Sequence, residues 1–504
     1  MPLPSTRPVL RARGALLVAL APLVGCRSAP TAAPPVTAST EAPPPASSGA
    51  EAPVVQGREA PSMPVCTASD ALVAAPLAES LAATPALARN GTTGLVAFIT
   101  RPDNGPDPVL ALLSLNAEGA PTDASGSLRD PRIVADAGAS PTGPALVAHE
   151  DGYLLVWRHG TRGQHGLSAL RLDAEGAPRG AVTALVRPGG TLGVPAVAVD
   201  ARGGRWVAIT RASGAAGFDT VVLVGPEGPP REIAAPAGGV WDGDAPVLVP
   251  QATGGVAVYA TLAPRDAGAE VERSLLRVDG EAPALVARDL DRPDAMPLGA
   301  DGVLWAWRAR VARRDASLRV VTLLDDLQQP HPPLSLATFR GAFDLRPHLV
   351  TLGAHRGVLS LSLLGDEPVG ALTLALLGDD GAPVGRAPEL NSFAARSGRL
   401  AVASAPRGSS DTSVWVAADG RAGTQPRLLV TRVQCDAGRA VEPLDIPQGA
   451  FVQDVAPGDA APAQLARGDG ASGGCTVRQS GTLVTHLSGV DDDPMQGTST
   501  AVVN

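Results

Sequence analysis

The chain has 504 residues and a formal net charge of -9, and each of its 41 basic side chains is arginine. Because it contains no lysine, it cannot use a lysine Schiff base, a lysine general base or the lysine of a phosphate-binding loop. The net negative charge does not favour a nucleic-acid partner, because nucleic-acid binding usually needs a basic surface. The length allows two or three ordinary domains or one large repeat domain.

Residues 1–25 have the pattern of an export signal. Three arginines precede an apolar run over residues 15–24, which is too short to span a bilayer and fits the apolar region of a signal peptide. The run ends in the letters LVGC at residues 23–26, which resemble the bacterial lipobox. This resemblance implies that Cys26 receives a diacylglyceryl group and becomes the mature N-terminus, where several acyl chains anchor stably. An ordinary secretory signal with a chance cysteine is the alternative.

The next segment predicts a location and a tether. Arg27 stands where aspartate commonly retains bacterial lipoproteins at the inner membrane, so we expect attachment to the outer membrane. Residues 26–65 are rich in Pro, Ala, Ser and Thr, a composition that cannot build an apolar core. We therefore expect a disordered tether that starts at the lipidated Cys26 and holds a folded domain away from the lipid surface.

A proline followed by a short apolar strand recurs along residues 66–440. The recurring prolines lie 59, 51, 51, 51, 50 and 41 residues apart, and they are Pro85, Pro144, Pro195, Pro246, Pro297, Pro347 and Pro388. Each copy continues with a polar turn, an apolar strand, and an alternating strand that ends in a Gly-containing turn. Short apolar strands between Gly, Pro and Asp turns are typical of antiparallel sheet. A period of about 50 residues over seven copies indicates a repeat architecture.

Seven copies with room for four strands each predict an all-β fold, a seven-bladed β-propeller over residues 66–440. Two β-sandwiches of three or four repeats are the alternative. A strand between two blades needs apolar side chains on both faces, and Leu155 and Val156 meet this need on opposite faces of one strand. The chain resembles bacterial, myxobacterial-type lipoproteins with a propeller repeat domain, whose activities are mostly uncharacterised.

Three cysteines remain after Cys26, and an exported chain can join two of them in a disulfide. Cys66 lies where the tether ends, and Cys435 ends the last strong strand of the repeats. Cys475 lies in the Gly/Ala-rich C-terminal region, residues 441–504, where the sequence favours a hairpin. We expect Cys435 to pair with Cys475. Pairing of Cys66 with either would instead clasp the two ends of the ring, and three unpaired thiols are the third alternative.

Few residues suggest a metal or catalytic site. His149, Glu150, His159 and His165 flank successive turns of one repeat and fit polar loop residues better than converging metal ligands. The run Asp491–Asp493 fits a solvated acidic tail, because calcium ligands alternate along a loop. A nucleophile elbow, a His-Glu-x-x-His zinc motif and a Gly-rich phosphate loop are all missing. We therefore predict no metal, no cofactor and no catalytic residue.

Most tryptophans follow the turn of a repeat, where packing between blades accounts for them. These are Trp157, Trp206, Trp305 and Trp307. Trp241 lies in a stretch expected to be a loop, which makes it the best candidate for an exposed binding aromatic.

Two functions fit these observations. The first is a non-enzymatic, membrane-anchored lipoprotein whose propeller binds or scaffolds a protein or glycan partner. The alternative is a propeller enzyme, a polysaccharide hydrolase or lyase, whose site is assembled from several blades on the central face of the ring. Such a site leaves no local motif, and the fold alone does not decide between the two. The residues that line the ring's central face distinguish them.

Overall fold

The computed structural model describes residues 65–436 with internal gaps, together with residues 474–479 and 482–487. The gaps fall at residues 78–83, 102–106, 124, 162, 215–216, 266–272, 281, 289, 299–301, 311–315, 325–332, 340–345, 364–368, 379–380, 387–389, 406–408 and 423–424. The expected signal peptide, Cys26, the tether up to residue 64 and Asp491–Asp493 lie outside the described residues, so they stay predictions. Among the described residues, none forms a helix long and apolar enough to cross a membrane.

The described strands form antiparallel sheets, which are the blades of a propeller. The first five blades are separate sheets of four or five strands, and blades 6 and 7 are joined in one nine-stranded sheet. Blade 1 contains β3 (Ala86–Asn90), β4 (Thr93–Thr100), β5 (Val109–Leu115) and β6 (Arg132–Ile133). Blade 2 contains β7 (Thr142–His149), β8 (Gly152–Thr161), β9 (Gln164–Asp173) and β10 (Thr183–Val186). Blade 3 contains β11 (Thr191–Leu192), β12 (Ala196–Val199), β13 (Arg205–Ala212), β14 (Thr220–Val224) and β15 (Arg231–Ala234). Blade 4 contains β16 (Gly239–Trp241), β17 (Val247–Pro250), β18 (Val256–Pro264), β19 (Ser274–Arg277) and β20 (Ala284–Arg288).

The later blades follow the same plan until the ring closes. Blade 5 contains β21 (Asp291–Leu298), β22 (Gly302–Arg310), β23 (Ala316–Leu324) and β24 (Leu334–Phe339). Blade 6 contains β25 (Arg346–Leu352), β26 (His355–Leu363), β27 (Val369–Leu377) and β28 (Pro383–Arg386). Blade 7 contains β29 (Asn391–Ser404), β30 (Ser413–Ala422) and β31 (Gln425–Asp436), and its outer edge is completed by β1 (Val65–Ala68) and β2 (Leu72–Pro76). The strands β32 (Gly474–Gln479) and β33 (Thr482–Leu487) pair with each other.

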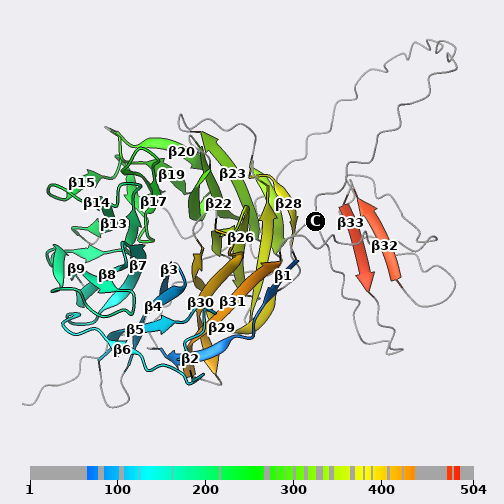
Figure 1. Cartoon of the computed structure of the whole chain (residues 1–504). Helices are drawn as coiled ribbons and strands as arrows, with labels where there is room; N and C mark the ends of the chain where they lie inside the picture. The colour runs from blue at the N-terminus through cyan, green and yellow to red at the C-terminus, as the bar shows by residue number, and fades with distance from the viewer. Residues whose placement is uncertain are drawn as a thin grey trace, which may run out of the picture. The chain divides into compact units, whose positions relative to one another are not determined.

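The inner strands of the blades make a closed ring. Strand β3 contacts β7, and the series continues through β12, β17, β21, β25 and β29, which returns to β3. Figure 1 shows the blades succeeding one another in chain order around this ring, with the N-terminal β1 and β2 beside the C-terminal β31. The predicted seven-bladed propeller is therefore confirmed. The alternative of two β-sandwiches is excluded, because two sandwiches would not join seven inner strands into one circle.

Each blade buries both of its faces against its neighbours. Seven separate apolar clusters fill the seven junctions between adjacent blades. Strand β8 illustrates the arrangement: Leu155 packs into the cluster between blades 1 and 2, while Val156 packs into the cluster between blades 2 and 3. Both side chains are 0% exposed. The sequence-based expectation of two apolar faces is confirmed at this strand.

A recurring turn explains why the third strand of several repeats ends in the same letters. In blade 2, the Oδ1 atom of Asp173 accepts hydrogen bonds from the backbone N–H groups of Glu175 at 3.1 Å and Ala177 at 2.6 Å. Asn116 makes the same two bonds in blade 1. The turn needs a left-handed residue, and Gly176 supplies it with a φ of 78°. The turn therefore depends on an Asx side chain and a glycine at fixed spacing.

The disulfide differs from the one expected. Cys435 of β31 is bonded to Cys66 of β1, so the prediction that it pairs with Cys475 is wrong. The physical reason is the register of blade 7, in which β1 runs antiparallel to β31 and places Cys66 directly opposite Cys435. Cys475 lies in β32, whose described pairing is with β33. The structure therefore contains the alternative in which Cys66 pairs with Cys435 and joins the two ends of the ring.

Candidate functional site

The direction of the strands defines one face of the ring, which we call the central face. In each antiparallel blade the inner strand begins on this face, and the second strand ends on it. The first residues of the inner strand therefore lie beside the last residues of the second strand. In blade 2 this pairs Thr142 with Arg158, and in blade 5 it pairs Asp291 with Arg308. Polar side chains at these positions in successive blades converge around the axis of the ring.

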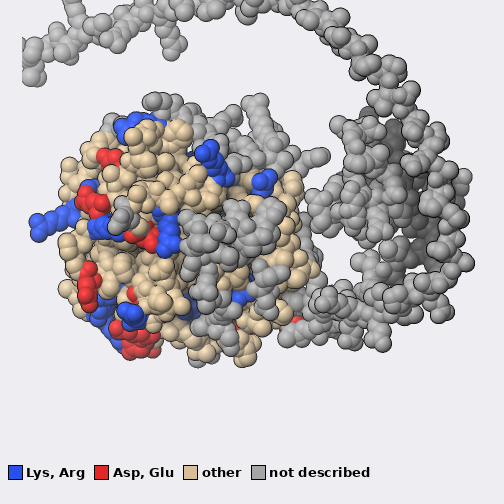
Figure 2. All heavy atoms as spheres, turned by 90° about the horizontal axis from the view of Figure 1, so that it is seen from above, with Lys and Arg blue, Asp and Glu red and all other residues tan. Residues whose placement is uncertain are grey.

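Surface charge by itself does not identify a binding face. In the view of Figure 2, arginine and acidic side chains lie interspersed over the described surface, without an extended area of one sign. A site therefore has to be found from side chains that converge from several blades.

Ion pairs link blades 4 and 5 on the central face. Arg273 lies with its Nε atom 3.2 Å from Oδ2 of Asp242 and its Nη1 atom 2.6 Å from Oδ1 of Asp291. Arg308 pairs with the other oxygen of Asp291. Asp242 and Asp291 are each about one-fifth exposed, at 21% of the side chain. Both carboxylates thus lie beside a guanidinium group while solvent still reaches them.

Asp294 lies three residues further along β21 in a different environment. Its Oδ2 atom accepts a hydrogen bond from the backbone N–H of Leu349 in blade 6 at 2.7 Å, and its Oδ1 atom accepts one from Ala295 at 2.9 Å. Burial raises the pKa of Asp294 to about 6, although both hydrogen bonds oppose the rise. This carboxyl group therefore changes protonation close to neutral pH.

The backbone between the two aspartates is irregular. The pairing of β21 with β22 shifts register between Asp291 and Asp294, and Arg292 within the shift has a left-handed φ of 52°. A residue with a side chain adopts this conformation only where the surrounding structure compensates for its cost. A bulge re-aims the side chains on either side of it. Here it lies between the ion-paired Asp291 and Asp294, whose pKa is raised.

Blades 6 and 7 complete the cluster. Burial lowers the pKa of His348 on β25 to about 4, with a further contribution from Arg346, so its imidazole is neutral above that pH. The Nε2 atom of His348 is buried and has no hydrogen-bond partner among the described residues. Burial also lowers the pKa of Arg346, against the attraction of Asp244, Asp242 and then Asp419 on β30. We call this group the central-face cluster; it comprises Asp242, Asp244, Arg273, Asp291, Asp294, Arg308, Arg346, His348 and Asp419.

The cluster holds groups suited to proton transfer. Asp294 can be an acid near neutral pH, His348 can be a base, and Asp291 forms ion pairs with two arginines. Environments that separate the pKa values of neighbouring titratable groups are characteristic of acid–base sites. Within the described part of the chain, no group of three His, Cys, Asp or Glu side chains is arranged to hold a metal ion.

The histidines singled out from the sequence do not form one group. His149 is buried at the far end of β7, where its Nε2 atom is 3.7 Å from Oε1 of Glu150. His159 and His165 lie at the opposite end of blade 2, on β8 and β9. Ser168 Oγ lies 3.0 Å from Nε2 of His159, and Nδ1 of His165 accepts the N–H of Leu192 at 3.2 Å. Burial lowers the pKa of both of these histidines.

The expectation for Trp241 is wrong. This side chain is 1% exposed and packs in the cluster between blades 3 and 4. The reason is that residues 239–241 form β16, which pairs with β18 instead of forming a loop. The expectation of packing between blades is confirmed for Trp157, Trp305 and Trp307, which are buried, and for Trp206, which is half-buried against the same cluster as Trp241.

Sequence reasoning missed Asp291 and Asp294. The register of blade 5 shows why: Asp294 follows Pro293, as Ala145 follows the recurring Pro144 of blade 2, so Pro293 and not Pro297 is the repeat proline. With that alignment, Asp294 stands on an inner strand where blade 2 has alanine. A charged residue at a repeat position that is apolar in another copy is the sequence signal that could have identified Asp294 as a candidate site residue.

Comparisons with known proteins find similarity only to solved structures of low identity. No family model and no curated protein matches the chain. An ulvan lyase, described as a polysaccharide lyase, is 12% identical with a TM-score of 0.43, and the match covers 73% of this chain and 95% of the lyase. An α-L-arabinanase from Penicillium chrysogenum is 9% identical with a TM-score of 0.43, covering 73% and 98%. The β-propeller domain of the trilobed protease from Pyrococcus furiosus is 9% identical with a TM-score of 0.37, covering 74% and 100%.

These comparisons correct the prediction that the protein is not an enzyme. The solved propellers to which the chain is similar include polysaccharide lyases and arabinanases. The prediction rested on the missing local motifs, which a propeller enzyme need not contain, because its site draws single residues from several blades. At identities of 9% to 12% the similarity shows the fold alone, so the substrates of those proteins are properties of those proteins.

Proposed function

We propose that this protein is a propeller enzyme that cleaves a polysaccharide at the central-face cluster. The observation that carries the proposal is the pair Asp294 and His348, two titratable groups on adjacent inner strands whose pKa values burial moves to about 6 and about 4. Such poised groups cost stability and are characteristic of sites that transfer protons. The paired carboxylates and guanidinium groups around them match a substrate rich in hydroxyl groups, which both donate and accept hydrogen bonds.

Hydrolysis fits the carboxylates of blade 5. A glycoside hydrolase needs one carboxyl group that is protonated near neutral pH and a second that stays ionised. Burial gives Asp294 the first property, and Arg273 and Arg308 give Asp291 the second. In this proposal Asp294 protonates the leaving glycosidic oxygen, and Asp291 activates water or attacks the sugar.

Elimination is the second candidate, and His348 favours it. A polysaccharide lyase removes the proton next to a uronate carboxylate, which needs a neutral base and a cation to stabilise the developing charge. Nε2 of His348 has no described hydrogen-bond partner, and Arg346 lies two residues before it on the same strand. The products separate the two reactions, since only elimination leaves an unsaturated sugar.

We further propose that the enzyme works outside the cytoplasm, as a lipid-anchored protein of the outer membrane. The lipobox ending in Cys26 and the Pro-rich tether support this location. Palmitate labelling of wild type and Cys26→Ser in the source bacterium tests it. Equal labelling of the two would contradict the anchor without bearing on the enzymatic proposal.

The activity test uses neutral and uronate-containing polysaccharides with the full chain. We expect new reducing ends from hydrolysis, or unsaturated ends from elimination. Asp294→Asn should lower the rate about 100-fold or more, in the range of removing a general acid. Asp151→Asn is the matched control, because Asp151 is an exposed aspartate that pairs with Arg179 at the opposite end of blade 2. Activity that survives Asp294→Asn unchanged would place the reaction elsewhere.

A further inference from the structure

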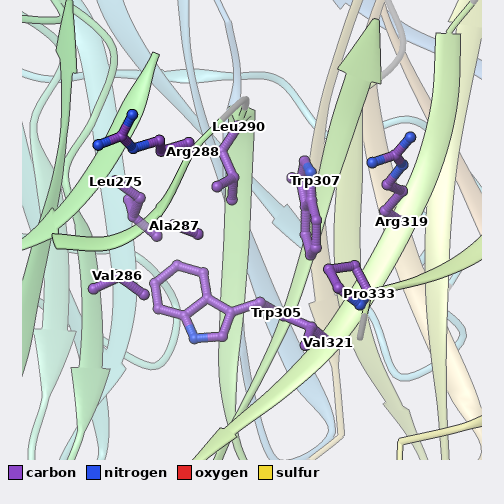
Figure 3. Close-up of a pocket in the computed structure, with 10 residues that line it drawn as sticks. All are labelled: Leu275, Val286, Ala287, Arg288, Leu290, Trp305, Trp307, Arg319, Val321 and Pro333. Atoms are coloured by element: carbon purple, nitrogen blue, oxygen red, sulfur yellow. The ribbon is translucent and has the colours of Figure 1, made fainter. Parts of the chain in front are cut away.

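A cavity lies in the junction between blades 4 and 5. Its walls come from β19 and β20 of blade 4 and from β22 and β23 of blade 5, and its volume is about 160 Å3. In Figure 3, Leu290, Trp305 and Trp307 lie in the middle of the lining, with Arg288 on one side of them and Arg319 on the other. The two guanidinium groups therefore do not meet at one point, and the space between them is apolar.

The cavity adjoins the central-face cluster. Leu290 directly precedes Asp291, and its backbone N–H donates a hydrogen bond to the carbonyl of Arg273 at 3.4 Å. Trp307 directly precedes Arg308, which is paired with Asp291 in the ladder of β21 and β22. The side chains of Arg273, Asp291 and Arg308 form the ion pairs of the cluster. A substrate held at these ion pairs would therefore lie beside the cavity.

The lining includes an exposed residue at the level of the cluster. Arg288 is exposed, and the ladder of β19 and β20 pairs it with Ser274, the residue after Arg273. A group attached to a substrate at the cluster can therefore enter the cavity along this side.

The size and lining of the cavity suit an aromatic ring. Between the two arginines the lining consists of aliphatic side chains, proline and two indole rings, and Trp305 and Trp307 are 1% and 3% exposed. The ring of Trp305 makes an edge-to-face contact with Tyr259, with ring centroids 4.7 Å apart. A rigid apolar cavity of roughly 150 Å3 holds a molecule the size of benzene. A sugar ring fits less well, because it would bury hydroxyl groups without hydrogen-bond partners.

We propose that the cavity binds an aromatic acyl group esterified to a sugar of the polysaccharide that the central-face cluster cleaves. Sugars offer hydroxyl groups, and esterification is a simple way for one of them to carry an aromatic ring. This inference rests on the proposed function and deepens it, since it names the substrate class as a polysaccharide with aromatic ester substituents. The ester itself is not cleaved; its ring is a recognition element.

A titration of the full chain with benzyl alcohol, followed by ligand-observed NMR, tests the cavity independently of any activity. We expect benzyl alcohol to bind the wild type. Ala287→Leu should weaken this binding about tenfold or more, because the longer side chain fills part of the cavity. Ala184→Leu is the matched control, because Ala184 is an exposed alanine on the outer strand β10 of blade 2. Absence of binding to the wild type, or equal binding to a folded Ala287→Leu variant, would overturn the proposal.

A comparison of substrates tests the role of the cavity in recognition. It uses a polysaccharide that the wild type cleaves, before and after some of its hydroxyl groups are converted to benzoate esters. The wild type should cleave the benzoylated polymer with a kcat/KM that is about tenfold or more higher, because the ring is transferred from water to an apolar cavity. This preference should disappear in Ala287→Leu and persist in Ala184→Leu.

The outcomes separate this inference from the proposed function. Equal kcat/KM for the two polymers in the wild type would refute the aromatic subsite and leave the proposed function intact. If benzyl alcohol binds but neither polymer is cleaved, the proposed function is wrong, and the role of the cavity in substrate recognition is refuted with it.

Discussion

At the scale of single residues, Asp294 and His348 make opposite contributions to stability as pH changes. Burial raises the pKa of Asp294 from 3.8 to about 6, so the folded state holds this proton more tightly and stability is lost as pH rises through that range. Burial lowers the pKa of His348 from 6.5 to about 4, so stability is lost as pH falls through that range. In the wild type these two pH dependences of the free energy of unfolding have opposite signs, so they partly cancel between pH 4 and pH 6.

Single substitutions should separate these slopes. In His348→Gln the free energy of unfolding should fall as pH rises from 4 to 6, because only the Asp294 slope remains. In Asp294→Asn it should fall as pH is lowered from 6.5 to 4. Each change is at most about 3 kcal/mol, from two pKa units. Urea unfolding in steps of pH measures both, and parallel profiles for the two variants would contradict the assignment.

The sequence indicated few of these residues for a physical reason. Asp294 has its raised pKa because β21 and β25 are neighbours in the ring and Leu349 donates to it from the next blade. Neither that contact nor the burial can be obtained from the order of residues within one repeat. The histidines of blade 2 were visible in the sequence, yet the fold places His149 at the opposite end of the blade from His159.

At the scale of the strand, β8 shows why the blade pattern could be predicted. A strand with one wet face alternates apolar and polar residues, whereas β8 carries apolar side chains on both faces. The structure places Leu155 and Val156 in different junctions between blades. The repeat and the two apolar faces are local features of the sequence, and they were sufficient to predict the propeller.

Leu155→Asp and Val156→Asp should therefore both be severely destabilising. Each buries an unpaired charge in a junction that is 0% exposed, and each should cost about 3 kcal/mol or more. Thr183→Asp in the exposed part of β10 is the control in the same blade, and it should melt close to the wild type. Thermal unfolding decides the matter: a wild-type melting temperature for either core variant would mean that β8 has a solvated face.

The closure of the ring was harder to predict than its blades. The repeat pattern ends near the last strand of blade 7, and nothing local says that residues 65–76 supply the missing outer edge. Cys66 and Cys435 are 369 residues apart in the sequence. The sequence therefore left their pairing open among alternatives.

At the scale of the whole molecule, the disulfide joins the two ends of the ring. It closes a loop that contains nearly the whole propeller, and long loops lose the most chain entropy when they are closed. The double variant Cys66→Ser, Cys435→Ser should lower the free energy of unfolding by about 2–5 kcal/mol. Denaturant unfolding measures the change, and Cys475→Ser is the matched control that should leave it unaltered. A loss caused by Cys475→Ser of the same size would contradict the observed pairing.

Ring closure also predicts how truncations behave. Removing residues 65–77 takes away β1 and β2, which leaves one side of β31 without its hydrogen-bonded partners. An unpaired strand edge invites pairing with another chain, and the lost contacts include Ala75 and Leu77 in the junction between blades 7 and 1. This variant should unfold at a lower temperature and form oligomers in sedimentation experiments.

Removing residues 441–504 is the control truncation. It takes away β32 and β33, whose described pairing is only with each other, and it should leave the melting temperature close to that of the full chain. If the two truncations behave alike, closure by the N-terminal strands contributes nothing to the stability of the ring.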